Sequence, residues 1–282
     1  MFVRAWGCRG SLATPEKEKL KYGGNTTCVE VVLNDGTLIV FDAGTGIRKL
    51  GQSILKRKEV KEIYLFLTHA HWDHLSGFPF FVPAYIPANT IHVRGGPRAK
   101  RFLHDFLSKQ MEPPYFPVTM NEMKAKIDFK EGKPEKMKIG SAEILPIPLN
   151  HPNGGYGFRI NDKKGSFVFL TDNEPGFNHP GGLKQTDYIQ FSKGADLLFH
   201  DSQYTSEEYA GKKGWGHSTF RESLLLGMSA RVRHIGFFHH DPERSDGALD
   251  TIVNRMKMQI EEDGRKLSCF GVKENTVITI RK

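Results

Sequence analysis

The stretch THAHWDH, residues Thr68–His74, determines how the rest of this 282-residue sequence is interpreted. It follows the apolar run IYLFL at 63–67 and contains three histidines and one aspartate. A buried imidazole or carboxylate needs a polar partner, so such a cluster is costly unless it has a use. Imidazole and carboxylate groups together are typical ligands of zinc, manganese or iron. The stretch therefore predicts half of a metal site, and the remaining ligands must come from elsewhere in the chain.

Three later apolar strands end in further residues that can bind metal. They lead into His151, into Asp172 and into the adjacent pair His239 and His240. Because loops at strand ends on a rigid scaffold commonly carry catalytic residues, these side chains are expected to converge at one rim of the fold. Adjacent residues on a strand point to opposite faces, so only one of the last two histidines should be a ligand.

The spacing divides these ligands between two metal ions. His69 and His71 lie two residues apart in a turn and can bind one ion, and His151 completes that site. Asp73 and His74 would then face a second ion. Trp72, between the two pairs, is expected to pack against its surroundings rather than to take part in chemistry.

Asp172 could bridge the two ions, because each of its carboxylate oxygens can bind one of them. One histidine of the pair at 239–240 would complete the second site. Two ions about 3.5–4 Å apart activate a hydroxide nucleophile and neutralise the charge that develops in an in-line displacement. Zinc is the expected metal, with manganese or iron(II) as alternatives.

The order of the predicted elements indicates an α/β fold. Asn34-Asp35-Gly36 is a strong hairpin signal between two strands of the first third. Strands recur in both halves, and helices are expected at residues 45–58, 97–110, 217–230 and 245–264. This pattern predicts a four-layer αβ/βα sandwich, in which two mixed sheets pack face to face with helices outside. We expect residues 1–282 to form a single domain, since no linker or internal repeat interrupts them.

Two smaller signals concern the surroundings of the site. Thr219 and Glu222 form a plausible capping box at the start of the third helix. Met111–Lys126 is irregular and contains three prolines, so it is expected to be a long surface loop or lid over the site.

The composition restricts the class of protein and its partners. The formal charge is +8, which favours anionic substrates, although glutamates interleave with the lysine-rich segments and solvated surface is the alternative interpretation. No nucleic-acid-binding module is evident, so sequence-specific DNA binding is not expected. Three widely spaced cysteines argue against a disulfide framework. Neither a signal peptide nor an apolar run of membrane-spanning length is present, and we expect a cytoplasmic protein without membrane contact.

The sequence resembles the metallo-β-lactamase fold superfamily over nearly its whole length. The matching motifs, in order, are GGNTTCVEV, FDAGTGIRKLG, THAHWDHLSGFPFF, LTDNE, HDSQY, GHSTFRE and FFHHDPERSD. The closest branch is that of the ribonuclease Z-like and cyclic-nucleotide phosphodiesterase-like metal-dependent hydrolases. The resemblance implies the αβ/βα sandwich and the two-metal site. It also implies that the ligand is the first histidine after the apolar strand, which selects His239.

The resemblance also implies a role for His217 in the GHST motif. In the resembling phosphodiesterases the matching histidine contacts the phosphate or protonates the leaving oxygen, which imidazole can do near neutral pH. Local packing at the helix start is the alternative. Asp201 is the candidate carboxylate to hold His217 protonated, and a structural turn or cap is its alternative. Asp73 could also accept a proton from the nucleophile, and Asp42 either orients a ligand histidine or is structural.

These observations predict a dinuclear metal-dependent phosphodiesterase that acts on a small anionic phosphodiester such as a cyclic nucleotide. Ribonuclease Z that processes transfer RNA carries a long glycine-rich arm, whereas only 20 residues separate His151 from Asp172 here. RNA is therefore the less favoured substrate. The alternatives are an RNA 3′-end nuclease of the ribonuclease Z type and a non-hydrolytic dimetal sensor or binding module. A homodimer is a further expectation, because relatives of this branch often form dimers.

Overall fold

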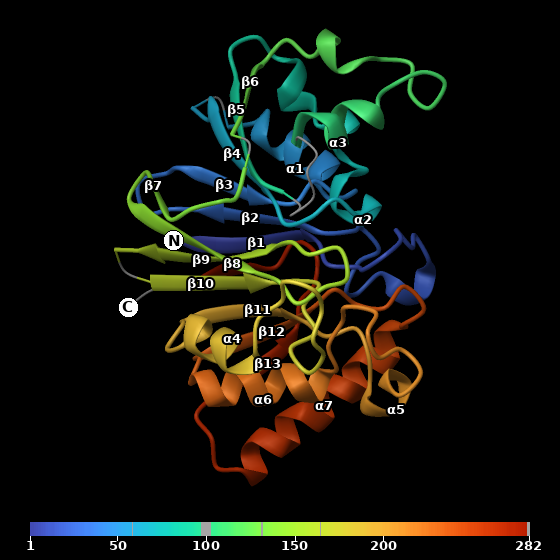
Figure 1. Ribbon diagram of the computed structural model, residues 1–282, viewed down its shortest axis with the longest axis vertical. Helices are drawn as coiled ribbons and strands as arrows, with labels where there is room; N and C mark the ends of the chain where they lie inside the picture. Colours follow the sequence, from blue (N-terminus) through green and yellow to red (C-terminus); the bar gives the residue numbers. More distant parts are fainter. Residues whose placement is uncertain (58, 97–102, 131, 164, 281–282) are drawn as a thin grey trace.

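The computed structural model of the protein describes residues 1–57, 59–96, 103–130, 132–163 and 165–280 (Figure 1). Two mixed seven-stranded sheets lie at its centre, with α1–α3 on one side and α4–α7 on the other. The helices are α1 Ile47–Ile54, α2 Trp72–Leu75, α3 Leu103–Lys109, α4 Gln185–Ser192, α5 Ser206–Tyr209, α6 Phe220–Ala230 and α7 Asp246–Glu262. Short 3-10 turns cover Lys17–Lys19, Phe78–Phe80, Val82–Tyr85 and Met120–Glu122. The predicted sandwich of two mixed sheets with helices outside is confirmed.

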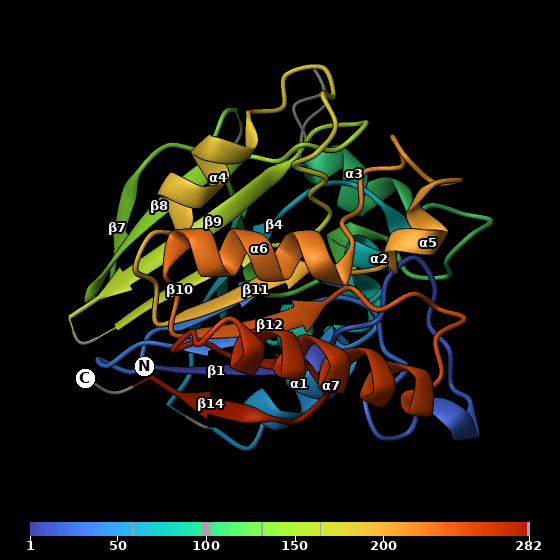
Figure 2. The ribbon, with the colours of Figure 1, turned by 90° about the horizontal axis from the view of Figure 1, so that it is seen from below.

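The first sheet combines antiparallel and parallel pairing. Its strands are β1 Phe2–Gly7, β2 Cys28–Val32, β3 Leu38–Phe41, β4 Glu62–Leu67, β5 Thr90–Gly95, β6 Lys126–Phe129 and β14 Val277–Thr279. Their order is β14-β1-β2-β3-β4-β5-β6, and β3 to β6 run parallel. The predicted hairpin joins β2 to β3: Leu33 N–H donates to Thr37 O at 3.0 Å, and Gly36 has a left-handed φ of +88°. Figure 2 shows β14 beside β1, although these strands lie near opposite ends of the sequence.

Four strands of the second sheet end at one edge of that sheet. Its strands are β7 Met137–Ile139, β8 Ala142–Pro148, β9 Tyr156–Asp162, β10 Gly165–Leu170, β11 Leu197–Asp201, β12 His234–Phe238 and β13 Ser268–Gly271. The order is β13-β12-β11-β10-β9-β8-β7, with β10 to β13 parallel. Strand β8 points the same way as β10, because both are antiparallel to β9. The carboxyl ends of β8, β10, β11 and β12 therefore lie at one edge.

Apolar side chains fill the space between the sheets. Phe41 of the first sheet stacks on Phe158 of the second at 5.4 Å between ring centroids, and Phe66 meets the same ring edge-on at 5.0 Å. Separate apolar clusters lie under α1 and under α4, α6 and α7. Figure 2 shows α6 and α7 across the second sheet. This packing makes the rim a rigid support, since it fixes both sheets relative to each other.

Several local predictions can be compared with these elements. The helix expected at 97–110 is described as α3, and residues 97–102 lie outside the described residues. The predicted capping box is present, because Glu222 N–H donates to Thr219 Oγ1 at 3.0 Å and the Glu222 carboxylate accepts from Thr219 N–H. The loop expected at 111–126 is irregular apart from one 3-10 turn. Gly264 ends the last helix with a φ of +62°, as its position predicts.

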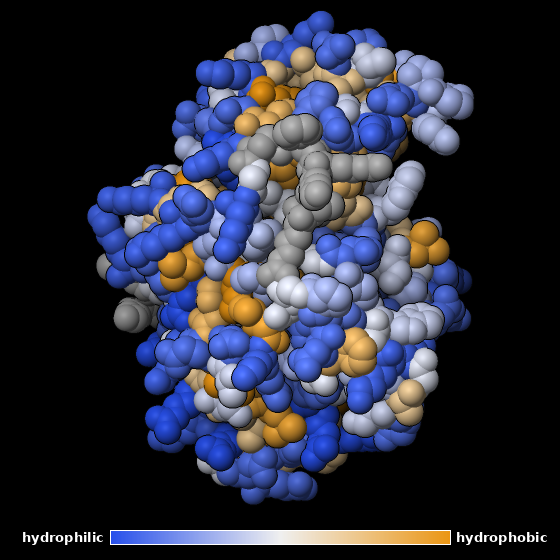
Figure 3. Space-filling model, viewed as in Figure 1, coloured by the Kyte–Doolittle hydropathy of each residue, from blue (hydrophilic) through white to orange (hydrophobic). Residues whose placement is uncertain are grey.

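One face of the molecule is largely polar (Figure 3). The face in Figure 3 is mostly hydrophilic, with small scattered apolar patches. Lys124, Lys126, Lys133 and Lys138 are exposed, which agrees with solvated surface for this lysine-rich segment. In the described ranges, no helix has both the length and the hydropathy that a bilayer crossing requires.

Candidate metal centre

The structure brings the seven predicted ligands together at the rim. They form two overlapping groups, and within each group one possible ligand atom per residue lies within 4.8 Å of the others. The first group is His69, His71, His151 and Asp172, and the second is Asp73, His74, Asp172 and His239. This division is the one that the spacing predicts, with Asp172 common to both groups. Metal binding by these residues stays a prediction, which the following geometry supports.

Asp172 lies at the centre of the cluster. Its Oδ1 lies 3.6 Å from His69 Nε2 and 3.3 Å from His239 Nε2, and its Oδ2 lies 3.3 Å from His74 Nε2. In the first group, His71 Nδ1 and His151 Nε2 face each other at 3.3 Å. Two ring nitrogens aimed at one point, beside a carboxylate, match the donor set of a zinc or iron site.

Two histidine nitrogens without hydrogen-bond partners in the described part of the chain test whether the cluster suits a metal ion. His69 Nε2 and His74 Nε2 are buried and have no hydrogen-bond partner among the described residues. Leaving such a group unpaired costs about 1–3 kcal/mol, so native structures seldom do it without a reason. Both nitrogens face the Asp172 carboxylate, where a cation would satisfy them. The residues present therefore fit a pair of divalent metal ions.

The pKa shifts differ between the two groups. Burial lowers the pKa of His151 to about 3, and it lowers the pKa of His69 and of His71 as well. Burial acts in the same direction on His74 and His239, but the neighbouring carboxylates outweigh it. They raise the pKa of His239 to about 9 and that of His74 well above its ordinary value. The first group is thus ready to bind metal as neutral imidazoles, whereas metal binding to the second displaces protons.

Partners behind the cluster fix which nitrogen faces inward. Asp42 Oδ2 accepts a hydrogen bond from His74 Nδ1–H at 2.8 Å, and Gly216 O accepts one from His151 Nδ1–H at 3.1 Å. His239 Nδ1–H donates to Gln203 Oε1 at 3.0 Å. Each bond leaves an Nε2 lone pair directed at the cluster, as metal-binding histidines require. Of the two interpretations of Asp42, the one in which it orients a histidine matches this geometry.

Asp42→Asn is expected to weaken metal affinity by about 10- to 100-fold, the usual cost of losing a carboxylate behind a metal-binding histidine. The amide is nearly isosteric, and asparagine tolerates the left-handed φ of +62° at this position. Competition with a fluorescent zinc chelator measures the change. As a control, Asp128→Asn removes a carboxylate that pairs with Arg94 away from the cluster and should leave the affinity unaltered. Equal affinity in both variants would contradict the orienting role.

His217 and Asp201 lie together beside the second group, as expected. His217 Nδ1–H donates to Asp201 Oδ2 at 2.8 Å, and Asp201 Oδ1 accepts from Ser218 N–H at 2.8 Å. The His217 ring stacks on that of His239, with centroids 4.9 Å apart and an interplanar angle of 16°. Asp172, Asp201, His217 and His239 form a third group, in which one possible ligand atom per residue lies within 4.8 Å of the others. The proton-donor role of His217 stays a prediction, with metal binding as the alternative.

The backbone explains why His239 and not His240 joins the cluster. His239 follows β12 with a left-handed φ of +61°, which breaks the alternation of the strand. Its neighbour His240 points away and donates from Nε2 to Val272 O at 2.7 Å. Asp42 and Asp172 also have left-handed backbones after β3 and β10, with φ values of +62° and +52°. Such residues are uncommon outside glycine and gather at functional sites.

A buried glutamate that the sequence does not single out supports the site from behind. Glu174 Oε1 accepts from Tyr209 O–H at 2.6 Å and from Gly214 N–H at 2.7 Å. Its Oε2 accepts from Gly216 N–H at 2.7 Å and from His179 Nε2–H at 2.8 Å. The carboxylate thus holds the loop that presents Gly216 O to His151. Only its position in LTDNE, two residues after Asp172, could have drawn attention to it.

Glu174→Gln is expected to lower the free energy of unfolding by about 1–3 kcal/mol, because an amide donor would face the N–H and O–H donors around it. It should also reduce activity, since Gly216 and the following His217 would move. Denaturant titration of the metal-loaded protein measures the stability. The exposed Glu261→Gln provides a matched control and should unfold as the wild type does. A Glu174→Gln protein with wild-type stability would show that the four bonds are not important.

Trp72 does not pack as predicted. Its side chain is 74% exposed at the start of α2, where it lines a surface cavity. The prediction of a packing role is therefore wrong. The cause is local: His71 and Asp73 turn inward, which directs the residue between them to solvent.

The fold and the metal-ligand cluster together define a metallo-β-lactamase-type hydrolase centre. A sequence model of the β-lactamase superfamily domain matches residues 37–240, and the chain belongs to this superfamily. The matched range includes all seven predicted ligands. The resemblance stated from the motifs is thereby confirmed.

Individual relatives lie within the expected branch. A ribonuclease Z from Pyrococcus furiosus is 24% identical over 252 residues, which covers 74% of this chain and 78% of that protein. The solved structure of human tRNase Z, short form, has a TM-score of 0.67 at 18% identity and is covered completely, as is this chain. A diphosphatase from the PhnP family has a TM-score of 0.68 at 17% identity, with 99% of this chain and 97% of that chain covered. The two solved structures show a shared fold.

Proposed function

We propose that the protein is a metal-dependent phosphodiesterase that hydrolyses a small anionic phosphodiester such as a cyclic nucleotide. The observation that carries this proposal is the His217–Asp201 pair, 2.8 Å apart, lying directly against the two groups of predicted ligands. Superfamily membership and the ligand clusters support a metal-dependent hydrolase. The added proton-donor pair suits a reaction in which a poor oxygen leaving group departs.

The chemistry divides between the cations and the protein. Two divalent ions, zinc by preference and manganese or iron as alternatives, would act as Lewis acids toward the phosphate and the attacking water. His217 donates a proton from Nε2 to the leaving oxygen, while Asp201 holds its Nδ1–H and stabilises the charged ring. Asp73 is the proposed acceptor of the proton from the nucleophile. Its Oδ2 is positioned by the Ser11 N–H at 2.8 Å.

RNA cleavage is the second candidate function, because the curated relative from Pyrococcus furiosus is a ribonuclease Z. The segment between His151 and Asp172 argues against a large RNA, because β9 and β10 take up most of its 20 residues. Binding of extended RNA would need many contacts to phosphate groups, and the affinity of the protein for RNA would then fall steeply as the salt concentration rises. We therefore place RNA second.

The deciding experiment compares substrates across metals. Protein reconstituted with zinc, manganese or iron(II) is assayed against bis-p-nitrophenyl phosphate, cyclic nucleotides and single-stranded RNA at two salt concentrations. We expect phosphodiester turnover that chelation abolishes, with cyclic nucleotides preferred over RNA. Bound metal without any turnover would contradict the proposal and favour a non-hydrolytic dimetal module. Salt-sensitive cleavage confined to RNA would favour the nuclease.

A further inference from the structure

The cluster is accessible from one side of the THAHWDH stretch. His69, Asp73, His74, His151, Asp172 and His239 are buried. His71 is only partly buried, and Ala70 before it and Trp72 after it are also open to solvent. A substrate that reaches the cluster past His71 therefore meets the surface around Trp72.

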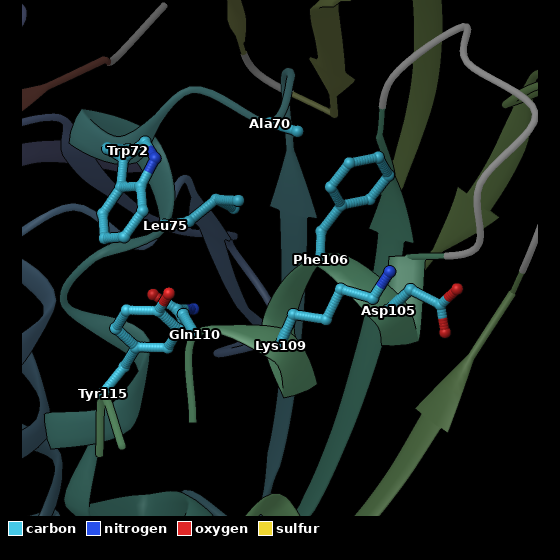
Figure 4. Close-up of a pocket in the computed structure, with 8 residues that line it drawn as sticks. All are labelled: Ala70, Trp72, Leu75, Asp105, Phe106, Lys109, Gln110 and Tyr115. Carbon is cyan, nitrogen blue, oxygen red and sulfur yellow. The ribbon is translucent and has the colours of Figure 1, made fainter. Parts of the chain in front are cut away.

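That surface contains a cavity of about 370 Å³ (Figure 4). Ala70 and Trp72 line it from the metal side, and α3 and the loop after it line the opposite side. The volume lies in the range of about 300–1,000 Å³ that is typical of small-molecule sites. None of its described lining residues is a predicted ligand, but Ala70 and Trp72 flank His71 in the chain, so the cavity begins one residue away from the ligand cluster.

The lining combines flat apolar groups with a few polar ones. Trp72, Phe106 and Tyr115 supply three aromatic rings, and Tyr115 is 80% exposed. Figure 4 shows these side chains arranged around the hollow together with Lys109 and Gln110. Gln110 Nε2 is buried and has no hydrogen-bond partner among the described residues. A flat ligand ring with acceptors on its edge would match the aromatic walls, the Lys109 ammonium group and, after rotation of the Gln110 side chain, this unsatisfied donor.

We propose that this cavity binds the nucleobase of the substrate, stacked against Trp72 and Tyr115, while its phosphodiester lies at the metal centre. This inference rests on the proposed phosphodiesterase function. Nucleobases stack on exposed aromatic side chains with little dependence on sequence, and polar edge contacts add selectivity. A sugar alone would leave the three rings without a flat partner. An acyl chain would leave Lys109 and Gln110 without polar partners.

The test uses two esters with the same leaving group, thymidine 5′-(p-nitrophenyl phosphate) and ethyl p-nitrophenyl phosphate. Trp72→Ala and Tyr115→Ala are expected to lower kcat/KM for the thymidine ester by about 5- to 150-fold, the equivalent of ~1–3 kcal/mol of stacking. The change should appear mainly in KM, and the ethyl ester should be unaffected. Trp72→Phe should restore most of the loss. Equal losses for both esters would overturn the proposal.

Two controls separate this inference from the function on which it rests. Tyr115 lies on the loop away from the ligands, so its variant reports on the cavity even if Trp72→Ala disturbs His71 and Asp73. Met258→Ala, on the exposed face of α7, should change neither ester. Metal content is measured for every variant.

Binding to metal-free protein decides the case in which neither ester is hydrolysed. Thymidine 5′-monophosphate should then bind measurably by calorimetry, and ribose 5-phosphate should bind at least 5-fold more weakly. Equal binding of the two compounds would contradict nucleobase binding in this cavity, whether or not the proposed phosphodiesterase function holds. A short oligoribonucleotide, compared with the thymidine ester, tells whether the base belongs to a single nucleotide or to an RNA end.

Discussion

Asp172→Asn is expected to leave at most one tightly bound divalent ion per chain and to reduce kcat/KM for phosphodiesters by more than ~100-fold. The loss should exceed the about 10- to 100-fold that an outer partner such as Asp42 contributes, because Asp172 belongs to both ligand groups. The fold should survive, since asparagine also accepts the left-handed backbone found at 172. Plasma mass spectrometry of dialysed protein gives the metal stoichiometry.

The control for this experiment is Asp128→Asn, which alters an exposed carboxylate on β6 and should retain two ions and full activity. Two bound ions in the Asp172→Asn protein would show that the bridge is dispensable. The shared site inferred from the geometry would then be wrong, even if activity fell.

His217→Ala is expected to lower kcat by roughly 10²–10⁴-fold for substrates with a poor leaving group, the usual contribution of general acid catalysis. With p-nitrophenolate, which leaves readily without a proton, the loss should be much smaller. The measurement is kcat for a cyclic nucleotide and for bis-p-nitrophenyl phosphate, together with the metal content. His234→Ala, at the exposed start of β12, is the matched control and should behave as the wild type.

The two roles open to His217 give different results. A proton donor leaves the metal content at its wild-type value and produces a dependence on the leaving group. A metal ligand, as the third group permits, would cost metal and slow both substrates alike. Equal rates in the wild type and in His217→Ala would exclude both roles.

Much of the rim could be predicted because its signals are local. Each ligand lies in the short segment that follows an apolar strand, and the strand direction within a sheet then determines which edge receives it. His151, Asp172 and His239 were expected together on this ground, and the structure places them together. The choice between His239 and His240 required the family resemblance, because strand alternation alone cannot tell which of two neighbours points inward.

Other features depend on contacts between residues far apart in the sequence. The pairing of β14 with β1 joins two short strands from opposite ends of the described chain. Glu174 accepts four hydrogen bonds from residues that sequence patterns do not connect. Trp72 was misjudged because large aromatic residues are usually buried, and only the inward turn of both neighbours overrides this tendency.

At Asp42, Asp172 and His239, the left-handed backbone lowers stability in order to keep a functional side chain at the site. Glycine would adopt these conformations without the steric cost of about 1–2 kcal/mol that a side chain incurs there. A chain selected only for thermal endurance would be expected to carry glycine at such bends. That three strand ends, after β3, β10 and β12, instead carry carboxylate or imidazole groups indicates that selection acted on what these side chains do. Substitutions intended to raise the thermal stability of this protein should therefore avoid these three positions. They should be placed in parts of the sheets that are distant from the predicted ligands.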